Sequence, residues 1–85
     1  MGKEILVRVQ IKLFSVLRDY VSNYDPEKGV VADLPDDATV SDLLDHLGIP
    51  MSKAPVAICE GRILKSTDTI QPNSTLHIIQ PVAGG

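Results

Sequence analysis

Two glycines end the chain, and their main-chain terminus could do chemistry that no side chain performs. Gly84 and Gly85 follow Pro81-Val82-Ala83, so the terminal α-carboxylate has no Cβ atom beside it. Glycine adopts backbone angles that are closed to other residues, and such a tail can lie extended in a channel too narrow for a side chain. The reactive group would be the α-carboxylate of Gly85. A frayed terminus without function is the competing interpretation, because chain ends are usually mobile.

The side chains offer little other chemistry. A metal site requires several converging Cys, His or carboxylate ligands, whereas Cys59, His46 and His77 are far apart and have no CxxC or HExxH spacing. We therefore expect no bound metal. Cys59 is interpreted as a structural thiol at a strand end, since no basic neighbour in the sequence would activate it.

Composition restricts the class of protein. The chain has 85 residues, of which 44% are hydrophobic and 22% charged, as in one ordinary globular domain. With a net charge of −3, one Phe, two Tyr and no Trp, it lacks the basic and aromatic surface that nucleic acids or anionic membranes require. No apolar run approaches the roughly 20 residues that cross a bilayer. A single cysteine and the absence of a signal-peptide core predict a cytoplasmic location.

The first half of the chain predicts two strands and a short helix. Apolar and polar residues alternate over 4–13, which indicates a strand with one buried face. From Ser15 onward the apolar residues recur at helical spacing. We expect Ser15 to cap a short helix that ends before Pro26. A weaker strand is predicted at 30–34.

The best-defined helix runs from Val40 to Leu47. Its apolar residues recur at positions i, i+3, i+4 and i+7, which gives it one apolar face. Thr39 and Asp42 are spaced as a capping box, and Gly48 is expected to end the helix in the left-handed conformation.

A hairpin and a last strand complete the pattern. Residues 56–59 and 62–64 predict two short strands around a two-residue turn, followed by a connector at 66–73. The last strand covers 75–80 and is ended by Pro81, which removes a donor from the ladder. This order predicts an α+β domain in which a mixed sheet packs one face on the main helix, with the first and last strands side by side in its centre.

The whole arrangement resembles the ubiquitin-like β-grasp sulfur carriers of the MoaD and ThiS type, and specifically the MoaD family, the small subunit of molybdopterin synthase. The matching segments cover nearly the full chain: 9–18 with its Leu-Phe and Leu-Arg pairs, 38–44 with Leu47-Gly48, 56–58 with Gly61, and 81–85. The terminal Pro-Val-Ala-Gly-Gly motif is the most specific of them. Where the family often has an aromatic residue and a Pro-Pro pair, this chain has Ile79 and Gln80 before Pro81.

The resemblance implies a β-grasp domain at 1–80, with a mixed sheet on one main helix plus a short helix, and a flexible C-terminal Gly-Gly tail at 81–85. It implies that Gly85 is adenylated and converted to a thiocarboxylate that donates sulfur in the synthesis of molybdopterin, the molybdenum or tungsten cofactor. The domain would be the non-catalytic, sulfur-carrying subunit of a synthase-like enzyme and would bind no cofactor, since the activating partner uses the MgATP. The implied partners are an E1-like adenylating enzyme, the large subunit of molybdopterin synthase and a sulfur donor protein. The free domain is expected to be a monomer.

Partner binding is expected from the tail and from an apolar patch on the sheet. Pro81, Val82, Ala83 and Gly84 would thread into each partner in extended form. On the sheet face opposite the core, the expected docking residues are Leu6, Ile79 and Ala57, flanked by Arg8, Lys12, His77 and Arg62. Ordinary surface is the alternative interpretation of this patch.

Two other functions stay open at this point. A ubiquitin-like protein modifier would be joined through Gly85 to lysines of other proteins, and it shares the activation step with a sulfur carrier. A β-grasp binding module with an inert tail would not need Gly85. A carrier for thiamin biosynthesis is less expected, because such chains are typically shorter and lack the Pro-Val-Ala approach to Gly-Gly.

Overall fold

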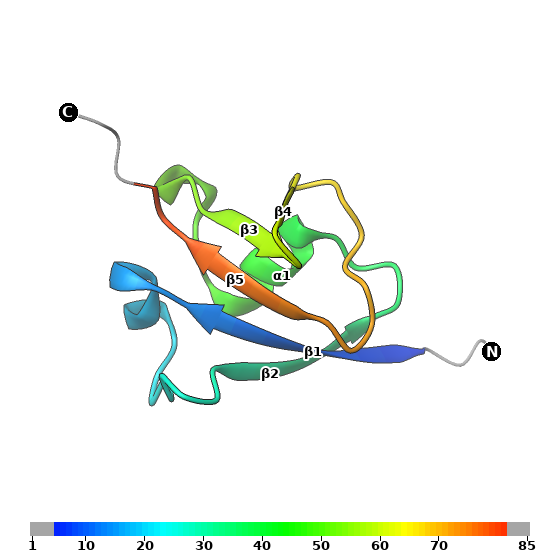
Figure 1. The fold of residues 1–85 in the computed structure, drawn as a ribbon, viewed down its shortest axis with the longest axis horizontal. Helices are drawn as coiled ribbons and strands as arrows, with labels where there is room; N and C mark the ends of the chain where they lie inside the picture. Colours follow the sequence, from blue (N-terminus) through cyan, green and yellow to red (C-terminus); the bar gives the residue numbers. More distant parts are fainter. Residues whose placement is uncertain (1–4, 82–85) are drawn as a thin grey trace.

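Five strands form one mixed sheet in the order β2-β1-β5-β3-β4 (Figure 1). The computed structural model describes residues 5–81 of the chain. The strands are β1 (Leu6–Leu13), β2 (Val30–Pro35), β3 (Val56–Cys59), β4 (Arg62–Leu64) and β5 (Thr75–Ile79). β1 and β5 run parallel at the centre, whereas the other neighbouring strands are antiparallel. The predicted α+β class and the central pairing of the first and last strands are therefore confirmed.

The main helix, α1 (Val40–Leu47), lies across one face of the sheet in Figure 1. Its first turn is closed by the predicted capping box. The hydroxyl of Thr39 accepts from the backbone N–H of Asp42 at 3.2 Å, and the Asp42 carboxylate accepts from the backbone N–H of Thr39 at 3.0 Å. Gly48 ends the helix with a φ of 76°, in the left-handed region that glycine adopts without strain.

The hydrophobic core lies between α1 and the inner face of the sheet. Because side chains alternate between the two faces of a strand, β1 directs Val9, Ile11 and Leu13 inward, and each is at most 1% exposed. β5 contributes Leu76 and Ile78, which are fully buried. The predicted alternation of these two central strands is confirmed by their burial.

The short helix predicted after β1 is a 3-10 helix, η1 (Ser15–Tyr20). Its N-cap is Phe14, which makes no side-chain hydrogen bond to the first turn. The prediction that Ser15 caps this helix is wrong, because Ser15 is its first residue and has a φ of 59°. This left-handed conformation turns the chain out of β1 and leaves the serine outside the cap position.

The long connections are more ordered than their sequences indicate. The loop before β3 contains a 3-10 turn, η2 (Met51–Lys53), which the sequence did not predict. The connector at 66–73 is anchored by Ile70, which is 2% exposed in the core, and by an isolated bridge between Thr39 and Thr69. None of the helices within residues 5–81 is long and apolar enough to cross a membrane.

The C-terminal end of β1 is fastened by a tyrosine. The Tyr24 hydroxyl accepts from the backbone N–H of Leu13 at 2.7 Å and donates to the Leu13 carbonyl at 3.2 Å. Arg18 also donates to this carbonyl at 3.1 Å, and its guanidinium lies 5.8 Å from the centroid of the Tyr24 ring. These bonds satisfy the backbone of β1 beyond Ile11, where its pairing with β2 ends.

Replacing Tyr24 with Phe should lower the free energy of unfolding by about 1–2 kcal/mol, because a part-buried backbone N–H loses its only described partner. Tyr20→Phe is the matched control: this ring also packs against the core, and its hydroxyl makes no hydrogen bond to residues 5–81. The control should stay within about 0.5 kcal/mol of the parent protein. Urea denaturation followed by circular dichroism measures both values, and equal losses in the two variants would contradict the assigned role of the Tyr24 hydroxyl.

Candidate functional site

β5 carries the chain to its C-terminal residues from the middle of the sheet. It is paired with β1 on one side and β3 on the other, and it ends at Ile79. Pro81 follows as an exposed residue. Of the predicted site residues, Val82, Ala83, Gly84 and Gly85 lie outside the described residues. The structure therefore gives the place on the domain at which the predicted reactive segment begins.

The outer face of the sheet, opposite α1, carries an apolar area near the end of β5. Successive cross-strand partners from β4 to β1 form one row: Ile63, Ile58, His77 and Lys12. In the next row toward the C-terminal end of β5, Val56 pairs with Ile79. Cross-strand partners lie on the same side of a sheet, so these side chains share one face.

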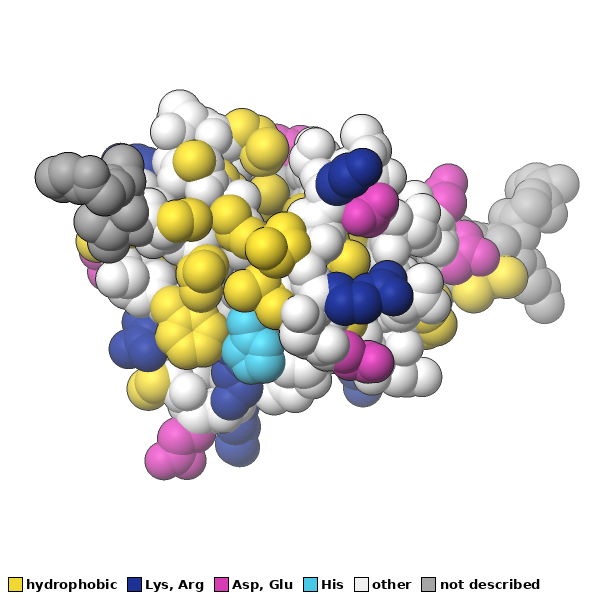
Figure 2. Space-filling view, turned by 45° about the horizontal axis from the view of Figure 1, so that its top comes forward, with side chains coloured by type: hydrophobic (Ala, Val, Ile, Leu, Met, Phe, Trp, Pro, Cys, Tyr) yellow, Lys and Arg dark blue, Asp and Glu magenta, His cyan; other side chains and the backbone are white. Residues whose placement is uncertain are grey.

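Phe14 extends this area beyond the end of β1. Its backbone N–H donates to the Ile78 carbonyl at 3.3 Å, and its ring centroid lies 5.7 Å from that of His77. We call the set Phe14, Val56, Ile58, Ile63 and Ile79 the apolar surface. Figure 2 shows hydrophobic side chains gathered on this half of the face, with a histidine at their border.

The apolar surface is exposed to different degrees. Ile63 is 72% exposed and Phe14 is 38% exposed, whereas Val56, Ile58 and Ile79 are half-buried by their neighbours. Scattered apolar side chains are normal on a protein surface, but a contiguous group of them is typical of an interaction site. This group lies beside the strand that leads to the C-terminal motif, so it is the candidate docking surface.

The other half of the outer face carries the exposed Leu6 and Val31, but its remaining side chains are polar and form hydrogen bonds with one another. Arg8 Nε donates to Asp33 Oδ1 at 3.1 Å, and this hydrogen bond together with the charge of the carboxylate raises the pKa of Arg8. Thr75 donates to Gln10 Oε1 at 3.3 Å. These mutual contacts make this half a poor candidate for docking an apolar partner.

Leu6 does not join the apolar surface. It pairs with Pro35 at the first residue of β1, whereas β5 ends beside the last residue, Leu13. With 8 residues in β1, these two ends are roughly 23 Å apart at the usual rise per residue. Leu6 is 53% exposed at that distal end, and its expected role in partner binding stays a prediction.

Two of the expected positions on the outer face are wrong. Ala57 is 2% exposed and faces the core, because the register of β3 with β5 directs Ala57 and Cys59 inward. Arg62 pairs with Cys59 and therefore lies on the inner side of the hairpin. Sequence reasoning missed Val56, Ile58, Ile63 and Phe14. Four consecutive apolar residues in β3 were the available signal, since they require an apolar residue on both faces.

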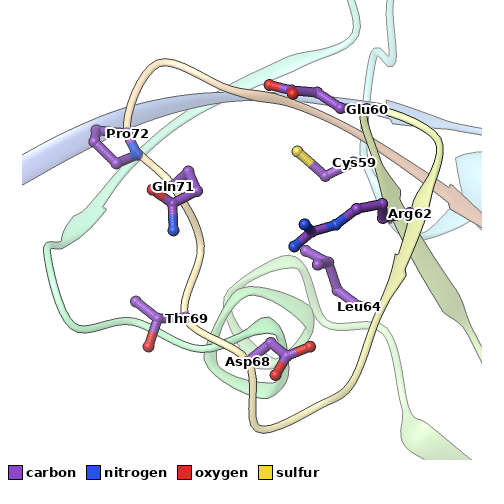
Figure 3. A pocket seen from close by; sticks show the side chains of 8 residues that line it. All are labelled: Cys59, Glu60, Arg62, Leu64, Asp68, Thr69, Gln71 and Pro72. Carbon is purple, nitrogen blue, oxygen red and sulfur yellow. The ribbon is translucent and has the colours of Figure 1, made fainter.

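A pocket of about 730 Å³ opens at the other end of β3, between the β3-β4 hairpin and the connector (Figure 3). The Cys59, Arg62 and Asp68 side chains are among those that line it. Cys59 is a buried free cysteine on the inner face. His77 is on the outer face, so the sheet separates this thiol from the histidine that could have served as its base. In residues 5–81, no three His, Cys, Asp or Glu side chains are grouped as metal ligands.

Comparison with known proteins identifies a matching sequence family and solved structures of the same fold. The sequence model of the ThiS family matches residues 11–85. Small archaeal modifier protein 1 of H. volcanii, a crystal structure, is 22% identical with a TM-score of 0.67 and covers 89% of this chain and 99% of its own. The solution structure of the Haloferax volcanii HVO 2177 protein is 20% identical with a TM-score of 0.75, over 100% of this chain and 92% of its own.

A third solved structure, Caldiarchaeum subterraneum ubiquitin, is 17% identical with a TM-score of 0.54, over 95% of this chain and 100% of its own. None of the curated proteins compared with the chain matches it. Likeness at these identities establishes the fold. The predicted β-grasp, ubiquitin-like architecture is confirmed, with one main helix and a 3-10 turn beside the five-stranded sheet.

A pair of variants on the β3-β4 hairpin tests the assignment of its two faces. Ile63→Asp should change the free energy of unfolding by less than about 1 kcal/mol, because the side chain is largely in water. Ala57→Asp should lower it by more than about 3 kcal/mol or prevent folding, because it places an unpaired carboxylate in the core. Urea denaturation measures both. A stable Ala57→Asp variant would contradict the inward orientation of Ala57.

Proposed function

Because the chain belongs to the ThiS family of ubiquitin-like sulfur carriers, we propose that it carries sulfur as a thiocarboxylate on its C-terminal Gly85. The observation that carries this proposal is the extent of the family match, which runs through the last residue and so includes the Gly-Gly end. Carriers of this family work with E1-like activating enzymes. An enzyme of that type is the partner we propose for the first step.

The chemistry begins with activation of the terminal carboxylate. A carboxylate is a poor electrophile, because its leaving group would be oxide. Attack of a Gly85 carboxylate oxygen on the α-phosphorus of MgATP, in the active site of the partner, gives an acyl-adenylate and releases pyrophosphate. Sulfur supplied by a donor protein at the oxidation level of sulfide then displaces AMP and leaves the thiocarboxylate. Its sulfur is a better nucleophile than a carboxylate oxygen and can be delivered to an acceptor.

The chain itself contributes position and recognition to this sequence of reactions. β5 is hydrogen-bonded on both sides, which fixes the point where the reactive segment begins. Pro81 restricts the backbone of that segment and lowers the entropy lost when a partner orders it. The apolar surface beside the end of β5 would be covered by the partner. No side chain of the domain is required as a catalytic acid or base.

For the acceptor, we propose a molybdopterin precursor held by the large subunit of a molybdopterin synthase. The Pro81-Val82-Ala83-Gly84-Gly85 motif supports this proposal, because it resembles the ending of the small subunit of that enzyme. The second candidate is a protein modifier joined through Gly85 to lysines. It is favoured by the similarity in fold to an archaeal modifier and to a ubiquitin. Activation of Gly85 is common to both.

Intact mass spectrometry tests the carrier function directly. After incubation with MgATP, a sulfur donor and an E1-like enzyme from the same organism, the chain should gain the mass of sulfur replacing one oxygen. A variant lacking Gly85 should gain nothing, because its terminal residue is no longer the one that the partner positions. No mass change with an enzyme that is active on another carrier would overturn the proposal. A ladder of covalent conjugates of the tagged chain in cell lysate would favour the modifier.

Ile79→Asp should weaken binding to the activating enzyme at least 10-fold, because a carboxylate would have to be desolvated at the centre of the docking surface. Val31→Asp is the matched control. Val31 is 57% exposed on the same face but pairs with Gln10 in the polar half, so its binding should stay within about 2-fold. Calorimetric titration measures both affinities, and thermal unfolding checks that both variants are folded. Unfolding of the Ile79 variant would instead assign Ile79 to the core.

A further inference from the structure

β1 begins well before the strand that pairs with its second edge. Its pairing with β5 starts at Gln10, and the hydrogen bond nearest the start of β1 on that side joins the Asn73 N–H to the Arg8 carbonyl at 2.8 Å. Before Arg8, β1 therefore has β2 on one side and no strand of residues 5–81 on the other. In Figure 1, the blue start of β1 projects beyond the turn that leads into β5.

The hydrogen bonds give the direction of the backbone groups along this edge. The Asp36 N–H donates to the Ile5 carbonyl at 3.0 Å, in the same register as the pairs between β1 and β2. Because alternate residues of an antiparallel pair are bonded, Val7 bonds to β2, whereas Leu6 and Arg8 direct their backbone groups away from it. The Leu6 N–H, the Leu6 carbonyl and the Arg8 N–H have no hydrogen-bond partner within residues 5–81.

A pocket of about 500 Å³ lies along these unpaired groups. The residues that line it come from β1, β2 and the connector: Leu6, Val7, Arg8, Asp33, Pro72 and Asn73. Leu6 is 53% exposed and Val7 is half-buried, so β1 offers an apolar side chain on each face here. The two charged residues of the lining, Arg8 and Asp33, form an ion pair with each other. The pocket thus joins unpaired backbone groups to apolar side chains, and the charges in its lining balance.

Unpaired N–H and C=O groups in strand geometry are a template for another extended chain. One residue of a segment parallel to β1 can donate to the Leu6 carbonyl and accept from the Arg8 N–H. The residue two positions earlier in that segment can accept from the Leu6 N–H. A strongly charged segment would find no unpaired opposite charge in the lining, because Arg8 and Asp33 already satisfy each other. An uncharged segment with apolar side chains beside Leu6 fits best.

We infer that this edge of β1 binds an extended, uncharged segment of a partner protein, which adds a short strand to the sheet beside Leu6 and Arg8. The site recognises main chain, so it differs from the apolar surface, which would be covered by side chains. It lies roughly 23 Å from the end of β5. A partner bound there leaves the C-terminal segment free for an enzyme that acts on Gly85. The inference goes beyond the proposed function and does not depend on it.

Peptide titration followed by NMR tests the inference on the ¹⁵N-labelled full chain. The probe is an acetylated and amidated Thr-Val-Thr-Val-Thr peptide. The amide signals of Leu6 and Arg8 should shift as it is added. Its matched control carries methyl groups on the nitrogens of two adjacent central residues, which removes a donor from each edge of the peptide. This control should bind at least 10-fold more weakly. Versions with Lys or Glu in place of both valines should bind no more tightly than the probe.

Two variants of the protein separate this edge from the rest of the sheet. Leu6→Pro removes an N–H that is not bonded to β2 and places a ring in the pocket, so the protein should fold and bind the probe at least 10-fold more weakly. Val31→Asp is the matched control, because Val31 is 57% exposed on the same face and does not line the pocket. Its affinity should stay within about 2-fold of the parent protein. Thermal unfolding checks both variants. If Leu6→Pro fails to fold, Leu6→Asp should still weaken binding by several-fold, because its charge is unbalanced.

Several outcomes would overturn the inference. Unchanged Leu6 and Arg8 signals with every peptide would exclude a binding edge. Equal affinity for the methylated peptide would show that main chain is not recognised. Tighter binding of the Lys or Glu version would refute an uncharged occupant. Shifts of the same two signals with protein concentration alone would assign the edge to a second copy of this chain. A variant lacking Gly85 should bind the probe like the parent protein, so failure of the proposed function leaves this result intact.

Discussion

The parallel pairing of β1 with β5 determines where the reactive end of the chain can be presented. Two strands from opposite ends of the sequence lie side by side at the centre of the sheet, in a register that aligns Leu13 with Ile78. Their inward side chains are at most 1% exposed, so a shift of one residue would bring apolar side chains to the wrong face of the sheet. The position at which β5 ends is therefore as well determined as the core itself.

The same pairing gives the two faces of the sheet different roles. The inner face is covered by α1 and supplies the hydrophobic core, which a domain of this size needs for stability. The apolar half of the outer face has no element of residues 5–81 packed over it, although Ile58 and Ile79 lie at the middle strands of the sheet. Apolar side chains at such positions add little to stability while they are exposed. They contribute binding free energy when a partner covers them. Recognition and folding thus use opposite sides of the same strands.

Most of the fold could be predicted from local patterns. The capping box of α1 needs only Thr39 and Asp42 at the right spacing, and the hairpin turn needs only Glu60 and Gly61, which adopt φ angles of 52° and 77°. β3 could not be assigned in the same way, because its four residues are all apolar and either face could be the buried one. Its orientation follows from the register with β5, which is a tertiary contact. Ala57 was therefore placed on the wrong face, and the residues of the apolar surface were missed.

Leu6 illustrates a second limit of prediction from the sequence pattern. Alternation correctly places it on the outer face, but residues that share a face can still lie at opposite ends of a strand. The relative direction of the two strands determines how far Leu6 lies from the end of β5. Because β1 and β5 are parallel, the C-terminal end of β5 is close to Phe14 and distant from Leu6. An antiparallel pairing would have brought Leu6 near Ile79 instead. The candidate docking surface is thus a product of topology, because parallel pairing places the end of β1 and Phe14 beside the end of β5.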